Sequence, residues 1–118
     1  MRDDTCIIMT TTDSQAEANR LAELLVTQRL AACVQTTPIT STYTWQDKLH
    51  RESEWLLLIK TRADHYEAVQ EVIIQHHPYE TPEIIQAPIT QGSPAYLAWM
   101  DAQTKPNDRL LVNIDKGN

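Results

Sequence analysis

The sequence predicts an α+β fold in which two helices cover one face of an antiparallel sheet. Three observations predict it: short apolar runs typical of strands, segments with apolar residues at helical spacing, and the alternation of the two along the chain. With 118 residues, of which 42% are apolar, the chain can form one domain with a hydrophobic core. We expect this domain to occupy residues 1–104, followed by a polar tail at residues 105–118.

The beginning of the chain predicts a strand followed by a helix. Residues 6–10 form a short apolar run that ends in threonines, which indicates a buried strand. Ser14 and Glu17 have the spacing of a capping box, in which both side chains satisfy free N–H groups at a helix start. We therefore expect a helix over residues 15–28, and its apolar residues recur at helical spacing.

The next segment predicts a hairpin. Residues 30–44 begin apolar, become rich in threonine and contain Pro38, which favours an edge strand or a bulge. The turn is expected at residues 46–48 and the returning strand at residues 54–61.

A second helix and a stiff loop follow the hairpin. Asp64 can cap a helix that ends near His76, because the residue before Pro78 resists helical geometry. The loop at residues 78–83 contains two prolines, which restrict its backbone.

The remaining elements complete the βαββαβ order of a ferredoxin-like fold. Residues 84–89 indicate a strand, and Ser93 with Pro94 marks the start of a short additional helix over residues 95–103. In the ferredoxin-like pattern the sheet is antiparallel and both main helices lie on one face.

The second face of this sheet is also predicted to be apolar. The strands at residues 6–9 and 54–61 carry apolar residues on both faces, apart from Lys60. A face exposed to water would alternate apolar and polar residues. We therefore expect an obligate homo-oligomer in which a second copy covers this face. The alternative is that the third helix and the tail cover it.

The charge pattern argues against nucleic-acid and membrane partners. The net charge is −6, from 10 basic and 16 acidic residues, and the basic residues are scattered singly. No apolar run has the length of a secretory signal or a membrane span. The simplest interpretation is a cytoplasmic protein in which Cys6 and Cys33 are reduced thiols, although a disulfide between them stays open.

Five motifs along the chain resemble the CutA divalent-cation tolerance proteins over residues 6 to about 102. They are Leu30-Ala31-Ala32-Cys33-Val34, Ser41-x-Tyr43-x-Trp45, Glu54-x-x-Leu57-x-Ile59-Lys60-Thr61, His77-Pro78-Tyr79-Glu80-x-Pro82-Glu83-Ile84 and Tyr96-Leu97-x-Trp99. The resemblance implies a ferredoxin-like homotrimer in the bacterial cytoplasm, associated with tolerance to copper and other divalent metals and without a firmly assigned reaction. It also implies a likeness in shape to the nitrogen-regulatory PII proteins, and therefore a sensing role as an alternative.

The candidate metal ligands are His76 and His77, because imidazole is a common ligand for copper. The resemblance implies that this pair binds copper together with a position at the end of the first strand, which falls on Met9. A thioether at that position suits Cu(I). The alternative is that one histidine caps the helix and the other packs against Tyr79.

The candidate cleft residues are aromatic and charged. The resemblance implies that Tyr43, Trp45, Glu54 and Lys60 line clefts between subunits, where they could bind a small anion. The alternative is that Lys60 pairs with Glu54 or another carboxylate in the trimer interface while the rings pack.

Glu80 and Glu83, on the stiff loop, could act as cation ligands or as an acid–base pair, although a solvated loop is the commoner outcome. Cys33 lies in an apolar run and is expected to pack as a small hydrophobic residue.

Three hypotheses follow. The leading one is a copper-binding or divalent-metal-binding homotrimer that takes part in metal tolerance and has no catalytic cycle. The second is a PII-like signalling or scaffold trimer that binds a small molecule between its chains. The third, an enzyme that uses Glu80 or Glu83, has the least support.

Overall fold

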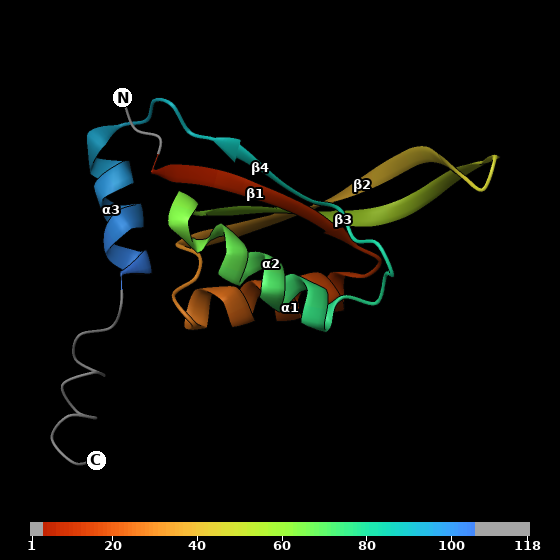
Figure 1. Cartoon of the computed structure of the whole chain (residues 1–118), viewed down its shortest axis with the longest axis horizontal. Helices are drawn as coiled ribbons and strands as arrows, with labels where there is room; N and C mark the ends of the chain where they lie inside the picture. Colours follow the sequence, from red (N-terminus) through yellow and green to blue (C-terminus); the bar gives the residue numbers. More distant parts are fainter. Residues whose placement is uncertain (1–3, 106–118) are drawn as a thin grey trace, which may run out of the picture.

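The computed structural model describes residues 4–105 of the chain. Figure 1 shows a four-stranded sheet with helices, together with a long hairpin that extends beyond the sheet. The elements, in chain order, are β1 (Thr5–Thr12), α1 (Gln15–Thr27), β2 (Cys33–Trp45), β3 (Lys48–Arg62), a 3₁₀ turn (Ala63–His65), α2 (Tyr66–His76), β4 (Ile84–Pro88) and α3 (Pro94–Thr104).

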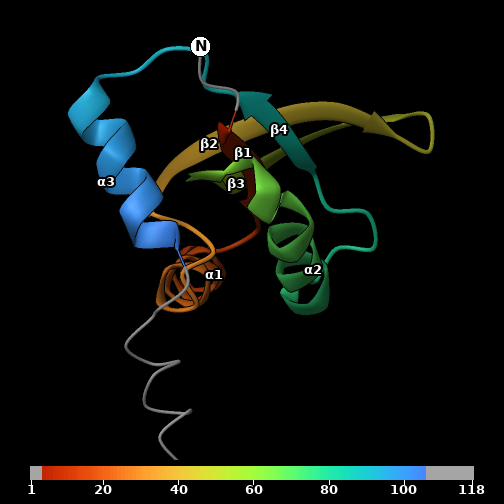
Figure 2. The ribbon, with the colours of Figure 1, turned by 60° about the vertical axis from the view of Figure 1, so that its left-hand side comes forward.

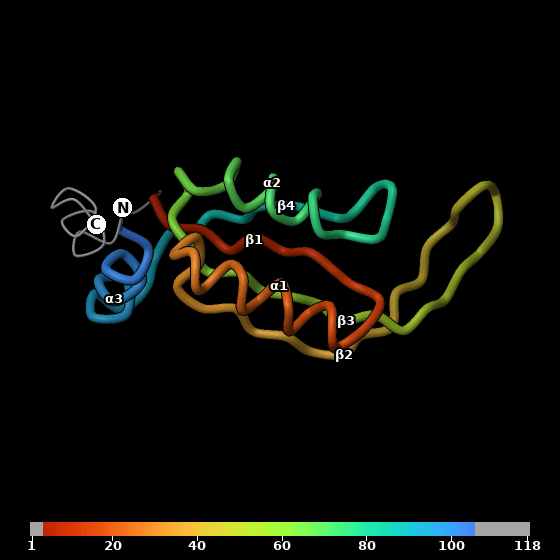
Figure 3. Tube along the Cα trace, turned by 90° about the horizontal axis from the view of Figure 1, so that it is seen from below, coloured from red at the N-terminus to blue at the C-terminus, as the bar shows by residue number. Residues whose placement is uncertain are grey.

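The sheet has the order β2-β3-β1-β4, and every neighbouring pair is antiparallel. Helices α1 and α2 lie side by side on one face, as the views in Figures 1 and 3 agree. The order and the one-sided helices confirm the predicted ferredoxin-like pattern. Strand β1 pairs with β3 on one side and with β4 on the other, so it lies inside the sheet.

The core lies between the sheet and the two helices. It consists of fully buried apolar side chains from all these elements: Cys6, Ile8, Ala18, Leu21, Leu25, Leu57, Ile59, Val69 and Ile73, with Ala31 beside them. A fully buried Leu or Ile stabilises the fold by about 1.5–3 kcal/mol. The even-numbered positions of β1 and the odd-numbered positions of β3 thus form the helix-covered face of the sheet.

The two helix starts differ from each other. Ser14 caps α1 as expected, because its hydroxyl accepts a hydrogen bond from the Glu17 N–H at 3.1 Å. The expected cap of α2 by Asp64 is wrong. Arg62 holds both carboxylate oxygens of Asp64 at 3.0 and 2.9 Å, and a 3₁₀ turn precedes the helix. His65 takes the cap position of α2 without a side-chain hydrogen bond.

The hairpin is longer than predicted. The returning strand begins at Lys48 instead of residue 54, and the turn consists of Gln46 and Asp47, which have positive φ angles of 54° and 65°. Residues 40–53 form an arm that projects past the end of β1 (Figure 1). We call these residues the hairpin arm. Neither face of the arm packs on a helix, so its residues are mostly polar. A polar segment lacks the apolar pattern from which the strand could have been predicted.

The second face of the sheet, which we call the open face, carries apolar side chains from three strands. They are Ile7 and Met9 of β1, Leu56 and Leu58 of β3, and Ile85 of β4, which is 50% exposed. Helix α3 packs at one end of the sheet, as Figure 2 shows, through Leu97 and Met100. It does not extend along this face, so the expected apolar second face is present in the single chain.

Both cysteines are free thiols. Cys6 is buried in the core, whereas Cys33 pairs in register with Lys60 on the open face, so the sheet separates the two sulfur atoms. The disulfide that the sequence left open does not fit this arrangement. Within residues 4–105, no helix combines the length and apolar character of a membrane span. The expected tail lies outside the described residues from residue 106 onward.

Candidate functional site

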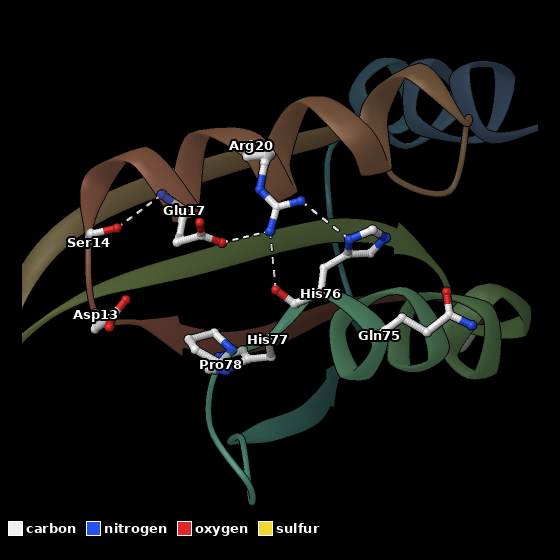
Figure 4. A pocket seen from close by; sticks show the side chains of 8 residues that line it. All are labelled: Asp13, Ser14, Glu17, Arg20, Gln75, His76, His77 and Pro78. Atoms are coloured by element: carbon white, nitrogen blue, oxygen red, sulfur yellow. Dashed lines mark hydrogen bonds and ion pairs between the residues drawn. The ribbon is translucent and has the colours of Figure 1, made fainter.

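The candidate metal ligands lie where α2 ends. His76 is the last residue of the helix, and His77 is extended, with φ −97° and ψ 137°, as the residue before a proline prefers. Pro78 therefore breaks the helix between the two imidazoles. Figure 4 shows their rings pointing in different directions.

Both nitrogens of His77 are engaged inside the chain. Its Nδ1 accepts a hydrogen bond from the Tyr79 N–H at 3.1 Å, so the proton of the neutral ring is on Nε2. That Nε2–H donates to the carbonyl oxygen of Thr11 at the end of β1. The ring also lies 4.6 Å from the Tyr79 ring, centroid to centroid. His77 thus connects β1 to the loop after α2, which confirms the packing against Tyr79 that the sequence analysis left as an alternative.

His76 faces an arginine of the neighbouring helix. The Arg20 Nη1 lies 3.3 Å from the His76 Nδ1 and donates to it when the ring is neutral. The Nη2 of Arg20 donates to the backbone oxygen of His76 at 3.3 Å and to Glu17 Oε1 at 2.8 Å. Arg20 therefore connects the first turns of α1 to the C-terminal carbonyl end of α2.

An open cavity of about 560 Å³ separates these two helix ends (Figure 4). It is lined by Asp13, Ser14, Glu17, Arg20, Gln75, His76, His77 and Pro78. The cavity thus combines two carboxylates, two imidazoles and one guanidinium. Among residues 4–105, no group of three or more His, Cys, Asp or Glu side chains is arranged to hold a metal ion.

Met9 lies on a different side of the sheet from α2. Ile8 points into the helix-covered core, so the alternation of β1 places Met9 on the open face, beside Leu58 and Ile85 in register. The structure therefore does not bring the Met9 thioether to the histidine pair within one chain.

The predicted cleft residues divide into two groups. Tyr43 and Trp45 are on the hairpin arm and line a second cavity, of about 260 Å³. Its other lining residues are Glu52, Tyr79, Glu80 and Thr81. Glu83, in the same loop as Glu80, is exposed and does not line this cavity.

Two tyrosine hydroxyls at this second cavity donate to glutamates. The Tyr43 hydroxyl donates to Glu52 at 2.6 Å, and the Tyr79 hydroxyl donates to Glu54 at 2.8 Å. Burial and the hydrogen bond to Glu54 raise the pKa of Tyr79 well above its ordinary value. Glu54 is only 8% exposed, so this hydroxyl supports a carboxylate that is largely withdrawn from water.

Lys60 is not part of this group in the single chain. It is six residues from Glu54 along β3, which corresponds to about 20 Å of strand. Its ammonium instead lies 5.5 Å from the centroid of the Tyr96 ring, at the α3 end of the sheet. Lys60 and Glu54 therefore do not pair within a protomer, and the pairing expected at the subunit interface stays a prediction. The second cavity has no lysine among its lining residues.

Sequence reasoning missed Arg20, Glu52 and Tyr79 as site residues. Arg20 had a weak signal, since Glu17 and Arg20 have the (i, i+3) spacing of an ion pair on one helix face. Glu52 was missed because the returning strand was expected to begin only at residue 54. Tyr79 reaches Glu54 across 25 residues, a contact that no local pattern encodes.

Comparisons with known proteins identify close relatives. Residues 6–103 match the family described as CutA1 divalent ion tolerance protein. The chain is 41% identical, over 97 residues, to the divalent-cation tolerance protein CutA of Yersinia pestis, which covers 81% of this chain and 82% of the relative.

Solved structures agree with this match. CutA from Xylella fastidiosa is 38% identical, with a TM-score of 0.84 over 86% of this chain and 99% of the other. The protein from Archaeoglobus fulgidus, described as a periplasmic divalent cation tolerance protein, is 34% identical with the same TM-score of 0.84 and the same coverage of both chains.

Proposed function

The chain belongs to the CutA1 divalent ion tolerance family, and we propose that it acts in metal-ion tolerance by binding copper at the two histidines that end α2. The observation that carries the proposal is the state of the two imidazoles. In both, Nδ1 is the hydrogen-bond acceptor and therefore the unprotonated nitrogen, whose lone pair can bind a metal once that hydrogen bond is displaced.

The imidazole nitrogens of the two histidines are chemically suitable ligands for copper. Imidazole nitrogen is a good ligand for copper, and a ligating histidine commonly donates its other N–H to a backbone carbonyl. His77 already makes this second hydrogen bond, through Nε2–H to Thr11, so its ring is held with Nδ1 as the nitrogen that carries no proton and can coordinate a metal. Copper at Nδ1 would take the place of the Tyr79 N–H.

The same geometry sets the cost of binding. Copper must displace one hydrogen bond at each ring, and at His76 it must also displace the Arg20 guanidinium from 3.3 Å. A metal cation and a guanidinium repel each other at that distance. Asp13 and Glu17 line the same cavity and supply compensating negative charge. We therefore expect binding that is coupled to a movement of Arg20. Met9 is not a ligand in this proposal, because it lies on the open face.

We further propose that the functional unit is a homotrimer whose subunits pack through the open face. The partly exposed Ile7, Leu56, Leu58 and Ile85 on this face support the proposal, since a face of this kind marks an interface. The number of subunits rests on the family resemblance. We also propose a cytoplasmic location, which is consistent with two free thiols. The protein would bind its metal without catalytic turnover.

Titration calorimetry with Cu(I) and Cu(II) tests the copper site. We expect saturable binding by the wild-type protein and at least about a tenfold loss of affinity in His76→Ala and in His77→Ala. His50→Gln is the matched control, because His50 lies on the hairpin arm and its ring stacks on Tyr43, 5.4 Å away. Equal affinity in the wild-type protein and in a double variant of both histidines would contradict the proposed site.

A further inference from the structure

The second cavity, beside the hairpin arm, is separate from the histidine pair and has a chemistry of its own. Aromatic side chains form much of its wall: Tyr43 and Trp45 from β2 and Tyr79 from the loop after α2. Its volume of about 260 Å³ is below the range of about 300–1,000 Å³ typical of drug-sized ligands. The cavity therefore suits a ligand smaller than a typical drug molecule.

The charge at this cavity is negative and is not balanced by ion pairs. Glu52 and Glu80 line it, and Glu54 lies next to it through its hydrogen bond with Tyr79. Among the described residues, none of these three glutamates forms a salt bridge. Glu54 is 92% buried, and its carboxylate has one hydroxyl donor. A carboxylate withdrawn from water gains more from a nearby cation than an exposed one does.

The basic side chains of the hairpin arm do not neutralise the negative charge at the cavity. Lys48 pairs in register with Trp45, and His50 pairs with Tyr43, so both share the face of the arm that carries these rings. Neither lines the cavity, and the His50 ring is stacked on Tyr43. Arg51 is on the opposite face of the arm, where its Nε lies 3.4 Å from the Thr42 hydroxyl.

We propose that this cavity binds a small organic ammonium ion. Aromatic faces attract a cation through their quadrupole, and an aromatic wall with acidic neighbours is the arrangement that recognises substituted ammonium groups. A bare metal ion fits less well, because hard cations require several oxygen ligands. Here one oxygen each of Glu52 and Glu54 already accepts a tyrosine hydroxyl. This inference is independent of the proposed copper site, because it uses none of its ligands.

The charge of the ligand can be tested with two molecules of the same shape. Choline carries a trimethylammonium group, and 3,3-dimethylbutan-1-ol has a neutral carbon in its place. Both are titrated into the full assembled protein by calorimetry, and the indole N–H of Trp45 is followed by NMR. We expect choline to bind at least about tenfold more tightly than the neutral alcohol and to shift the Trp45 signal.

Two variants and one control locate the binding. Trp45→Ala removes an aromatic wall, and Glu52→Gln removes a charge while it keeps an oxygen that can accept the Tyr43 hydroxyl. Each should weaken choline binding at least about tenfold. Trp99→Ala is the matched control, because Trp99 is similarly exposed, at 42% against 53% for Trp45, but lies on α3.

Three results would overturn the proposal. They are equal affinity for the two molecules, choline binding that survives in Trp45→Ala, and no saturable choline binding by the assembled protein. The last result is expected if a basic side chain of a neighbouring copy already occupies the cavity. Size-exclusion chromatography with light scattering on each variant verifies that the assembly is unchanged.

Discussion

Arg20 of α1 lies against His76 at the end of α2, with its Nη1 3.3 Å from the imidazole Nδ1 and its Nη2 3.3 Å from the backbone oxygen of the same residue (Figure 4). One guanidinium therefore occupies the acceptor nitrogen of a candidate ligand and also satisfies a carbonyl at a helix C-terminus. This carbonyl end attracts cations, so Arg20 stabilises the junction of the two helices while it competes with any metal that approaches His76.

Replacing Arg20 by glutamine should raise the copper affinity of the protein about tenfold. The change removes a positive charge next to His76 and a hydrogen bond that copper must otherwise displace. Calorimetric titration of Arg20→Gln with Cu(II), compared with the wild-type protein, measures the effect. Arg51→Gln, a change on the exposed hairpin arm, is the control for net charge. If the copper affinity of Arg20→Gln is equal to or lower than that of the wild-type protein, Arg20 does not compete with copper for His76. This outcome leaves open whether the histidines bind copper.

Replacing His77 by phenylalanine should lower the free energy of unfolding by about 1–3 kcal/mol. The substitution keeps a ring against Tyr79 but leaves the Thr11 carbonyl and the Tyr79 N–H without their partner. Urea unfolding monitored by circular dichroism gives the value. His76→Phe should cost less, because within residues 4–105 the His76 ring makes one hydrogen bond, an exposed one with Arg20. Similar stabilities of His77→Phe and the wild-type protein would show that the ring does not hold the loop.

The sequence predicted the arrangement of the fold better than the contacts of the site. The Ser14 cap, the break at Pro78 and the apolar second face each follow from local chemistry, and the structure contains all three. The predicted hairpin was too short because the polar residues of the hairpin arm resemble a loop. In the structure β2 and β3 pair continuously as far as Trp45 and Lys48.

The site contacts depend on distance in three dimensions, which local patterns do not encode. Arg20 and His76 are 56 residues apart in the sequence, and Tyr79 and Glu54 are 25 apart. The family resemblance implied a cleft between subunits that contains Tyr43, Trp45, Glu54 and Lys60, and its affinity for a small anion stays a prediction. Lys60 belongs to the same strand as Glu54 and yet lies at the other end of the sheet, beside Tyr96.

Alkaline pH should destabilise the protein through Cys6 and Tyr79. Burial raises the pKa of the Cys6 thiol from 9.0 to about 11, and burial with the Glu54 hydrogen bond raises the pKa of Tyr79 from 10.0. Between pH 9 and 11 the folded protein keeps a proton on Cys6 that the unfolded chain releases. The stabilisation from Cys6 is therefore complete below pH 9 and is lost as the pH rises to about 11, and that from Tyr79 is lost at pH values above 10.

The slope of this pH dependence is limited to about 1.4 kcal/mol per pH unit for each proton. Urea unfolding at pH 8, 9, 10 and 11 measures it for the wild-type protein, Cys6→Ala and Tyr79→Phe. Each variant should be less stable than the wild-type protein at pH 8 and should lose less stability toward pH 11. Parallel curves for all three proteins would show that neither group contributes.

A glutamate on the open face should dissociate the proposed trimer. Leu58 lies in the middle of this face, between Met9 of β1 and Gln35 of β2 in register, so Leu58→Glu places a charge where another copy would have to desolvate it. Light scattering after size-exclusion chromatography should give the mass of one chain or of unfolded aggregates, whereas the wild-type protein should give three times 13.5 kDa. Val26→Glu is the control, because Val26 is exposed on the opposite, helical side of the sheet. A trimer that persists in Leu58→Glu would place the subunit contacts elsewhere, and the hairpin arm, with exposed Leu49 and Trp45, is the next surface to alter.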